Sequence, residues 1–370
     1  MIRFLQLTPG EDAPLVQEAI ARVVTRGWFI LGPEVDAFEQ EFAAACGAPY
    51  AAGVGTGTDA LAIALRALGI GPGDEVITSP LSAAYSALAI MMAGARPIFA
   101  DIDPDRLTLD PRAAAAAVTS RTAAILPVHL YGQAADMRAM TEVAVRHNLA
   151  IVEDCCQAHL ATCEGRPVGS DGAAAAYSFY PTKNLGALGD GGALTMRDSS
   201  LLARVRRLRN GGQTDKYRHA EFGVNSRLDE MQAAILRARL PLLRGWTERR
   251  RALARAYREA LAGLDFIVVP PELDPGHVYH LFPVRSVARD AMQAHLQSAG
   301  IETLVHYPIP IPHQPALATE QPAECPVATR VCSEVFSLPL YPSLGDAAVS
   351  EVAGAIASAP RTANLELRTS

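Results

Sequence analysis

Short apolar segments alternate with helix-like segments along residues 50–153, and this alternation constrains the fold more than any other feature. The apolar segments have strand length and lie at Tyr50–Val54, Glu75–Ser79, Pro97–Asp101, Ala123–Val128 and Leu149–Glu153. The segments between them have helical apolar spacing and lie at Asp59–Leu68, Ser82–Ala93, Pro111–Val118 and Asp136–His147. Such βα alternation predicts an α/β fold with a largely parallel sheet covered by helices on both faces.

The rest of the chain predicts a second, smaller domain. Helices are expected at Leu15–Val24, Val35–Ala45, Leu201–Arg209, Leu228–Arg239 and Leu243–Leu261. Further along, we expect strands at Phe266–Val269 and Val278–Arg285, a helix at Asp290–Ala299 and a proline-rich loop at Tyr307–Pro315. We therefore expect a large domain over residues 1–243 and a small C-terminal α/β domain over residues 244–370, connected through the long helix near Trp246.

The composition excludes several classes of partner. A formal net charge of -6 over 370 residues argues against a nucleic-acid surface or a polybasic membrane surface. The chain shows no signal peptide and no run of about 18 apolar residues. Its 6 cysteines are scattered in a pattern typical of reduced thiols. We expect a cytosolic protein without nucleic-acid or membrane partners.

Lysine is rare in this chain, and one lysine occupies a distinctive position. Of 33 basic residues only Lys183 and Lys216 are lysines. Lys183 lies in the segment AAAAYSFYPTKNLGALGDGGA (173–193), where a small-residue strand runs into a glycine-rich stretch. Arginine cannot lose its proton or form an imine, whereas a desolvated lysine can do both. The segment therefore predicts that Lys183 is a Schiff-base lysine.

Two other segments carry candidate binding groups. The turn Gly55–Thr58 precedes a predicted helix, and backbone N–H groups at a helix N-terminus bind phosphate; the alternative is a plain capped turn. Asp154 ends a buried-looking strand, where a carboxylate can pair with a ring nitrogen; the alternative is that it caps the next helix. His129 is either a site residue or a hydrogen-bonded core histidine.

A metal site is not expected. Four potential ligands gather at Cys155, Cys156, His159 and Cys163, but their spacing matches no common zinc module. A phosphate cradle, a strand-end carboxylate and a lysine together match the needs of pyridoxal 5'-phosphate instead. On this hypothesis Lys183 holds the cofactor and moves a proton during amino transfer.

Seven ordered motifs strongly resemble those of the DegT/DnrJ/StrS family of pyridoxal-phosphate sugar aminotransferases. They are GTGTDALAIAL (55–65), DIDPDRLTLDP (101–111), PVHLYGQAADM (127–137), VEDCCQAH (152–159), SFYPTKNLGALGDGGAL (178–194), GVNSRLDEMQAAIL (223–236) and HYPIPIPHQPAL (306–317). The resemblance implies the fold of aspartate aminotransferase. It also implies a transaminase that acts on a nucleotide-linked 3-keto or 4-keto-6-deoxyhexose, with 3-keto favoured and glutamate as donor.

The resemblance also implies roles for individual residues. Lys183 resembles the Schiff-base lysine, Asp154 the partner of the pyridine nitrogen, and Gln157 the contact to the ring hydroxyl. Gly57, Thr58 and Ser178 match phosphate ligands. Asn225 resembles an asparagine that reaches the phosphate of the neighbouring subunit, which implies a homodimer with shared active sites.

The residues that would contact the substrate are less well defined. Lys216 and Tyr217 lie in a segment that resembles a sugar-nucleotide loop, although a surface role for Lys216 is equally open. Trp28 and His313 are further substrate candidates. Many relatives carry an aromatic residue over the cofactor ring where this chain has Ala83, so the residue that covers the ring is undefined.

Three rival functions fit these residues less well. A pyridoxamine-phosphate-dependent sugar dehydratase would have histidine in place of Lys183. A cofactor-binding regulator without turnover would not need the substrate loop. A nucleotide-binding oxidoreductase is disfavoured because the dinucleotide fingerprint is missing.

Overall fold

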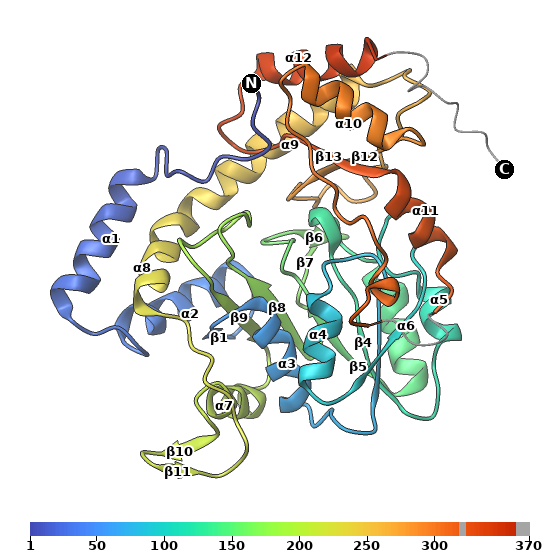
Figure 1. Cartoon of the computed structure of the whole chain (residues 1–370). Helices are drawn as coiled ribbons and strands as arrows, with labels where there is room; N and C mark the ends of the chain where they lie inside the picture. The colour runs from blue at the N-terminus through green and yellow to red at the C-terminus, as the bar shows by residue number, and fades with distance from the viewer. Residues whose placement is uncertain (318–322, 360–370) are drawn as a thin grey trace.

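A seven-stranded sheet forms the centre of the large part of the molecule (Figure 1). The computed structural model describes residues 1–317 and 323–359. In chain order the strands are β1 (Tyr50–Val54), β2 (Glu75–Thr78), β3 (Arg96–Phe99), β4 (Thr122–Leu126), β5 (Ala150–Asp154), β8 (Ala174–Ser178) and β9 (Gly192–Met196). Their spatial order is β1-β9-β8-β5-β4-β2-β3. Pairing is parallel from β8 to β3, whereas β9 is antiparallel to both β8 and β1.

Helices cover both faces of this sheet, which confirms the predicted α/β architecture. They are α2 (Pro33–Ala45), α3 (Gly57–Ala67), α4 (Tyr85–Met92), α5 (Pro111–Ala116), α6 (Met137–His147), α7 (Ser199–Leu208) and α8 (Glu230–Arg239). Successive side chains of a strand point to opposite faces. Val76 and Leu126 accordingly pack in one core with α3, α4 and α7. Ile77 and Ile125 pack in a second core with α2, α5, α6 and α8.

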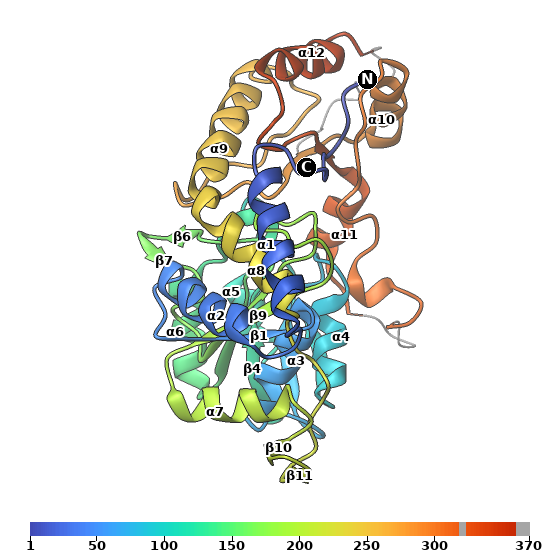
Figure 2. The ribbon, with the colours of Figure 1, turned by 90° about the vertical axis from the view of Figure 1, so that its left-hand side faces the viewer.

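The C-terminal part of the chain has its own core. Its elements are α9 (Leu243–Ala260), β12 (Phe282–Arg285), α10 (Arg289–Ser298), β13 (Val335–Leu338) and α12 (Asp346–Ala357). The strands β12 and β13 pair antiparallel, and Phe282, Leu296 and Ile356 belong to the same buried cluster. The N-terminus lies beside this part in both views (Figures 1 and 2), where Ile2 forms a bridge with Ile301.

The remaining elements connect these parts. They are α1 (Ala13–Arg26), α11 (Pro326–Glu334), the short hairpins β6–β7 (Thr162–Cys163, Arg166–Pro167) and β10–β11 (Gln213–Asp215, Arg218–His219), and 3-10 turns at Leu130–Gly132, Leu240–Leu242 and Ile311–His313. The β10–β11 hairpin projects from the body below α7 in Figure 1. No described helix combines the length and the apolar character that crossing a membrane requires.

Several predicted boundaries were wrong. The predicted strand Phe266–Val269 is reduced to a single bridge between Val268 and Arg285, and Val278–Arg285 is strand only from Phe282. The helix predicted from Ser82 begins at Tyr85. The division of the chain at residue 243 stays a prediction.

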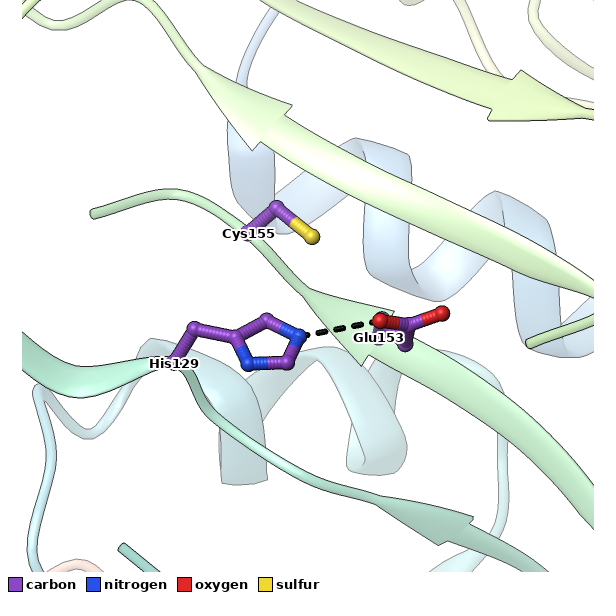
Figure 3. A group of neighbouring side chains, drawn as sticks. All are labelled: His129, Glu153 and Cys155. Atoms are coloured by element: carbon purple, nitrogen blue, oxygen red, sulfur yellow. Dashed lines mark hydrogen bonds and ion pairs between the residues drawn. The ribbon is translucent and has the colours of Figure 1, made fainter. Parts of the chain in front are cut away.

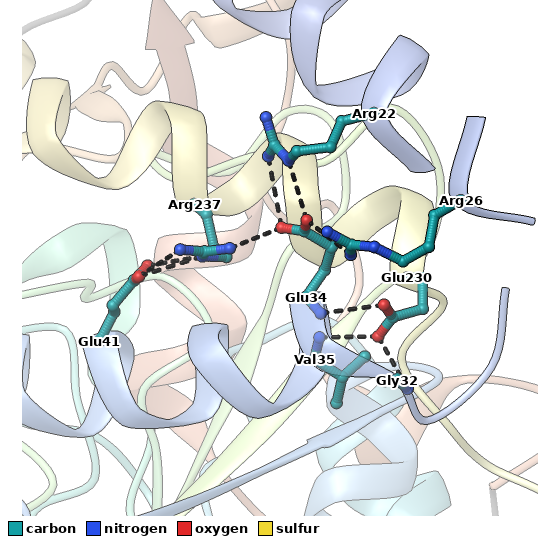
Figure 4. A network of polar contacts seen from close by, with 8 residues as sticks. All are labelled: Arg22, Arg26, Gly32, Glu34, Val35, Glu41, Glu230 and Arg237. Atoms are coloured by element: carbon teal, nitrogen blue, oxygen red, sulfur yellow. Dashed lines mark hydrogen bonds and ion pairs between the residues drawn. The ribbon is translucent and has the colours of Figure 1, made fainter. Parts of the chain in front are cut away.

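A buried carboxylate joins the N-terminal helices to α8. Glu230 accepts hydrogen bonds from the backbone N–H groups at the start of α2, those of Gly32, Glu34 and Val35, at 2.9, 2.9 and 2.8 Å (Figure 4). Beside it, Glu34 binds the guanidinium groups of Arg22 and Arg237. Burial alone would raise the pKa of Glu34, but these two arginines lower it to about 2. The network fixes the turn that carries Trp28.

Candidate active site

One cavity of about 880 Å³ collects all the predicted cofactor residues except Asn225. It lies where β1, β5 and β8 end, which is the edge of an α/β sheet at which ligands bind. Its wall includes six of the predicted residues: Gly57, Thr58, Asp154, Gln157, Ser178 and Lys183. The predicted site residues at the ends of β5 and β8, and on the segments that follow these strands, therefore meet those at the start of α3.

Lys183 lies on the loop that follows β8. Its backbone N–H donates to the carbonyl of Tyr180 at 2.8 Å. Gly186 keeps this loop tight, because a Cβ at that position would lie 2.5 Å from the carbonyl oxygen of Pro181. Burial lowers the pKa of the Lys183 amine, although Cys156 and Asp154 act in the opposite direction. The amine therefore gives up its proton more readily than an exposed lysine.

Asp154 is held in one orientation at the end of β5. Its Oδ2 accepts a hydrogen bond from Ser86 Oγ at 2.8 Å, and its Oδ1 accepts one from the N–H of Cys156 at 3.1 Å. The alternative that Asp154 caps the next helix is wrong, because the short strands β6 and β7 follow it in the chain. The carboxylate is 5% exposed and lines the cavity, so it is placed to pair with a ligand cation.

The start of α3 forms an anion cradle. Thr56 caps the helix by accepting the N–H of Asp59 at 3.0 Å, so the capped turn predicted as an alternative is present. The N–H groups of Gly57 and Thr58 have no acceptor within the helix, because the first turn lacks carbonyls before it. A Cβ at Gly57 would lie 2.7 Å from Ser178 Cβ, which shows how closely this turn approaches β8. The donors fit a phosphate group.

Gln157 and the segment before α4 complete the wall. The Gln157 side chain accepts the N–H of Tyr131 at 2.8 Å and donates to the hydroxyl of Tyr307 at 3.0 Å. Its second amide hydrogen stays available for a ligand oxygen. Ala83 and Tyr85 both line the cavity, and Tyr85 is 62% exposed. The tyrosine is therefore a candidate to cover a bound ring despite Ala83.

The other predicted residues lie outside this cavity. Asn225 is exposed and forms a backbone bridge with Asn210. Trp28 is 55% exposed, and His313 is exposed on the turn Ile311–His313. Lys216 is on the projecting hairpin, with its Nζ 5.2 Å from the ring centroid of Tyr217, which is 83% exposed. A single chain does not bring these residues to Lys183.

Some lining residues were not predicted individually. They are Ser86, His280, His306 and Tyr307. The ring of His280 contacts Asn184 Oδ1 at 3.1 Å, and His306 contacts Ser337 Oγ at 3.0 Å. The motif HYPIPIPHQP pointed to the loop that holds His306 and Tyr307. No sequence signal marked Ser86 or His280, whose positions depend on tertiary packing.

The described residues bring only one group of three potential metal ligands together: His129, Glu153 and Cys155 (Figure 3). His129 Nδ1 accepts the N–H of Ala135 at 3.0 Å, so Nε2 carries the proton and donates to Glu153 at 3.0 Å. Burial, with the charges of Glu153 and Asp154, raises the pKa of the Cys155 thiol well above its usual value. The group is therefore a hydrogen-bonded core network, which confirms the core alternative for His129.

Sequence comparison decides the family. The profile of the DegT/DnrJ/EryC1/StrS aminotransferase family matches residues 11–357. The chain belongs to this family. It is 51% identical over 331 residues to the dTDP-3-amino-3,4,6-trideoxy-alpha-D-glucose transaminase of Streptomyces venezuelae, covering 88% of this chain and 87% of the relative. It is 43% identical to the UDP-N-acetyl-3-dehydro-alpha-D-glucosamine 3-aminotransferase of Acidithiobacillus ferrooxidans, covering 93% and 94%.

Solved structures agree with this assignment. The crystal structure of S. venezuelae DesV in complex with a ketimine intermediate matches with a TM-score of 0.93 and 49% identity, covering 96% of this chain and 97% of that chain. This DegT/DnrJ/EryC1/StrS member is therefore a transaminase of a pyridoxal-phosphate-dependent family. The lysine, the carboxylate and the free N–H groups of the cavity fit that cofactor.

Proposed function

We propose that this chain transfers an amino group from glutamate to a keto sugar linked to a nucleoside diphosphate, as a step in amino-sugar biosynthesis. The sugar is a 3-keto- or 4-keto-6-deoxyhexose, with the 3-keto form favoured. The observation that carries the proposal is the convergence of Lys183, Asp154 and the free N–H groups of Gly57 and Thr58 in one cavity. The names of relatives that form or use 3-amino sugars on dTDP and UDP support the substrate class.

Each cofactor residue has a distinct task in this proposal. Pyridoxal phosphate, when bound, supplies the electron sink for moving the amino group. Asp154 would hold the protonated ring nitrogen, because its two hydrogen bonds fix its carboxylate at the end of β5. The N–H groups of Gly57 and Thr58 and the hydroxyl of Ser178 would hold the phosphate.

Lys183 would act at two stages, as the covalent anchor and as the proton carrier. Its Nζ is in a buried environment that lowers its pKa. A lowered pKa increases the share of the neutral amine, which is the form that acts as a nucleophile and as a base. The presence of this lysine also argues against the dehydratase alternative.

We further propose a homodimer with shared sites in the cytosol. Asn225, Lys216, Tyr217, Trp28 and His313 are exposed or half-exposed and lie outside the cavity of their own chain. In a dimer, residues of one copy would complete the cavity of the other. Asn225 would then contact the cofactor phosphate of the partner.

The test begins with the visible spectrum of the purified protein. A bound cofactor should give an absorbance that bleaches on addition of glutamate and returns on addition of the keto-sugar acceptor. A panel of dTDP- and UDP-linked 3-keto and 4-keto sugars would then identify the acceptor. The proposal would be wrong if the protein bound no pyridoxal phosphate, or if no nucleotide-linked keto sugar restored the absorbance.

A further inference from the structure

The loop that carries Lys183 is tied to other segments by the side chain of Asn184. In the described part of the chain, the hydrogen bonds of residues 182–185 are of two kinds. One is local, from the Lys183 N–H to the Tyr180 carbonyl, and the others are made by the Asn184 side chain. Packing of Leu185 in the core fixes the far end of the loop. Asn184 is therefore the polar anchor that places Lys183 relative to the rest of the molecule.

Asn184 binds a turn of the C-terminal part of the chain, between α9 and β12. Its Nδ2 donates to the carbonyl of Val278 at 2.9 Å, and its Oδ1 lies 3.1 Å from Nδ1 of His280. A carbonyl only accepts, so the NH₂ group of the amide faces Val278 and the amide oxygen faces His280. His280 Nδ1 therefore carries the proton and donates to Asn184 Oδ1.

The surroundings of His280 keep its ring neutral. The residue is 6% exposed and belongs to the wall of the cavity that Lys183 lines. Burial lowers the pKa of this imidazole well below its usual value, and the charges of Lys183 and Arg250 act in the same direction. A neutral ring with its proton on Nδ1 keeps the bond to Asn184 and adds no positive charge beside Lys183.

The turn that carries His280 has a strained backbone. Tyr279 has a φ of 44°, in the left-handed region that a bulky side chain seldom adopts. Gly132 packs closely against this turn, because a Cβ at that position would lie 2.9 Å from the backbone nitrogens of Tyr279 and His280. The Gly132 carbonyl also accepts the N–H of Val278 at 3.0 Å. Strained residues persist where surrounding contacts fix them, so the turn presents its two partners to Asn184 in set positions.

We propose that His280, acting through Asn184, is a positioning residue for Lys183. This inference rests on the proposed role of Lys183 as the covalent anchor of the cofactor. The Nδ1–H group of His280 holds the Asn184 amide, and the amide holds the loop that brings Lys183 to the cavity wall. A misplacement of a reacting group by about 1 Å can slow its reaction roughly 100-fold.

Two amide variants separate this role from a general effect of losing the ring. The NH₂ group of asparagine can take the place of the imidazole Nδ1, whereas that of glutamine takes the place of Nε2. His280→Asn can therefore keep the donor to Asn184, and His280→Gln loses it. Asn184→Ala removes both bonds. The matched control is His295→Gln, because His295 lies on α10 of the same part, contacts the Ala355 carbonyl at 3.0 Å and does not line the cavity.

The assay follows the covalent reaction of Lys183 rather than turnover. Cofactor-free protein is mixed with saturating pyridoxal phosphate, the rise of the visible absorbance is timed, and borohydride trapping locates the adduct. The other lysine of the chain, Lys216, is exposed and serves as the internal reference. We expect Asn184→Ala and His280→Gln to slow the rise roughly 10- to 100-fold. His280→Asn should recover most of the wild-type rate, and His295→Gln should leave it unchanged.

Pyridoxamine phosphate distinguishes a misplaced lysine from a damaged cavity. It lacks the aldehyde that an amine attacks, so its affinity, measured by equilibrium dialysis, reports the cavity without the covalent bond. This affinity should be the same in the wild type and in every variant.

Three results would overturn the inference. They are an unchanged rate in Asn184→Ala and His280→Gln, equal rates in His280→Asn and His280→Gln, and a loss of pyridoxamine phosphate affinity that parallels the loss of rate. Absence of an adduct on Lys183 in the wild type would overturn the proposed function together with the inference.

Discussion

Substitution of Glu153 by glutamine gives a sharp test of the buried network beside the site. This carboxylate is fully buried at the end of β5, one residue before Asp154. It accepts four hydrogen bonds, three of them from the backbone N–H groups of Gly169, Asp171 and Gly172. The fourth comes from His129 Nε2, as Figure 3 shows. Two donors meet each oxygen. The network therefore joins two separate segments, the turn 169–172 and the one that carries His129, to the strand that positions Asp154.

A glutamine at position 153 cannot satisfy this arrangement. An amide has one acceptor oxygen and one NH₂ donor, so either orientation places the NH₂ group against two N–H donors. His129 cannot relieve the conflict by changing tautomer, because Nδ1 accepts the N–H of Ala135. Two unpaired buried donors at roughly 1–3 kcal/mol each give a loss of about 2–6 kcal/mol in the free energy of unfolding.

Urea unfolding followed by circular dichroism and by tryptophan fluorescence would measure this loss, provided the two probes agree. Glu248→Gln is the control, because that side chain is 68% exposed and its ion pair with Arg251 is expected to contribute no more than about 1 kcal/mol. A loss for Glu153→Gln no greater than that of the control would refute the reasoning.

The environment of Glu153 also predicts that the stability of the fold depends on pH. Burial acts to raise the pKa of Glu153, but the hydrogen bonds from His129 and the backbone outweigh it and lower the pKa. A lowered folded-state pKa stabilises the fold above the unfolded-state pKa, and this stabilisation is lost as the pH falls. The difference in stability between wild type and Glu153→Gln should therefore shrink on acidification below about pH 4.

Three further outcomes are expected. Lys183→Ala should lose the borohydride-trapped cofactor adduct; retention of the adduct would contradict the role of this lysine. Mixing Lys183→Ala with Asn225→Ala chains should restore part of the activity, and no recovery after verified subunit exchange would contradict a shared site. Ser86→Ala removes the hydroxyl that binds Asp154, so turnover should fall roughly 2- to 10-fold; an unchanged rate would show that this hydrogen bond does not position the carboxylate.

The sheet was predictable because its strands are apolar and regularly spaced. Each of the five strands predicted in residues 50–153 is present, within about two residues at its ends. The alternation of Val76 with Ile77 between two cores shows why both faces required helices. The direction of β9 was not predictable, since antiparallel pairing with β1 depends on long-range contacts.

The C-terminal part was predicted less well, for a related reason. The segment Phe266–Val269 has strand-like composition, yet only Val268 finds a backbone partner, in Arg285. The strand β13 and the helices α11 and α12 were missed, although β13 is the partner that makes β12 a strand. Strand propensity reports fit to a pleated neighbour, and that neighbour is distant in sequence.

The cofactor side of the site was predictable because its residues lie on strand ends and a helix start. Lys183, Asp154 and the turn at Gly57 occupy positions whose chemistry follows from local sequence. Ser86 was not singled out, because a serine in an apolar helix gives no sign that its hydroxyl binds Asp154.

Under the proposed function, the distribution of charge favours a contribution from a second copy of the chain to substrate binding. The wall of the candidate active-site cavity carries three acids, Asp154, Asp190 and Glu302. Its one amine is that of Lys183, to which we assign the covalent bond to the cofactor and the proton transfer. A nucleoside diphosphate adds further negative charge, which such a wall would repel. The exposed Lys216 lies on a hairpin that projects away from the body, so its charge is available to another copy. Recognition of the nucleotide by a partner subunit is therefore the arrangement that best relieves this repulsion.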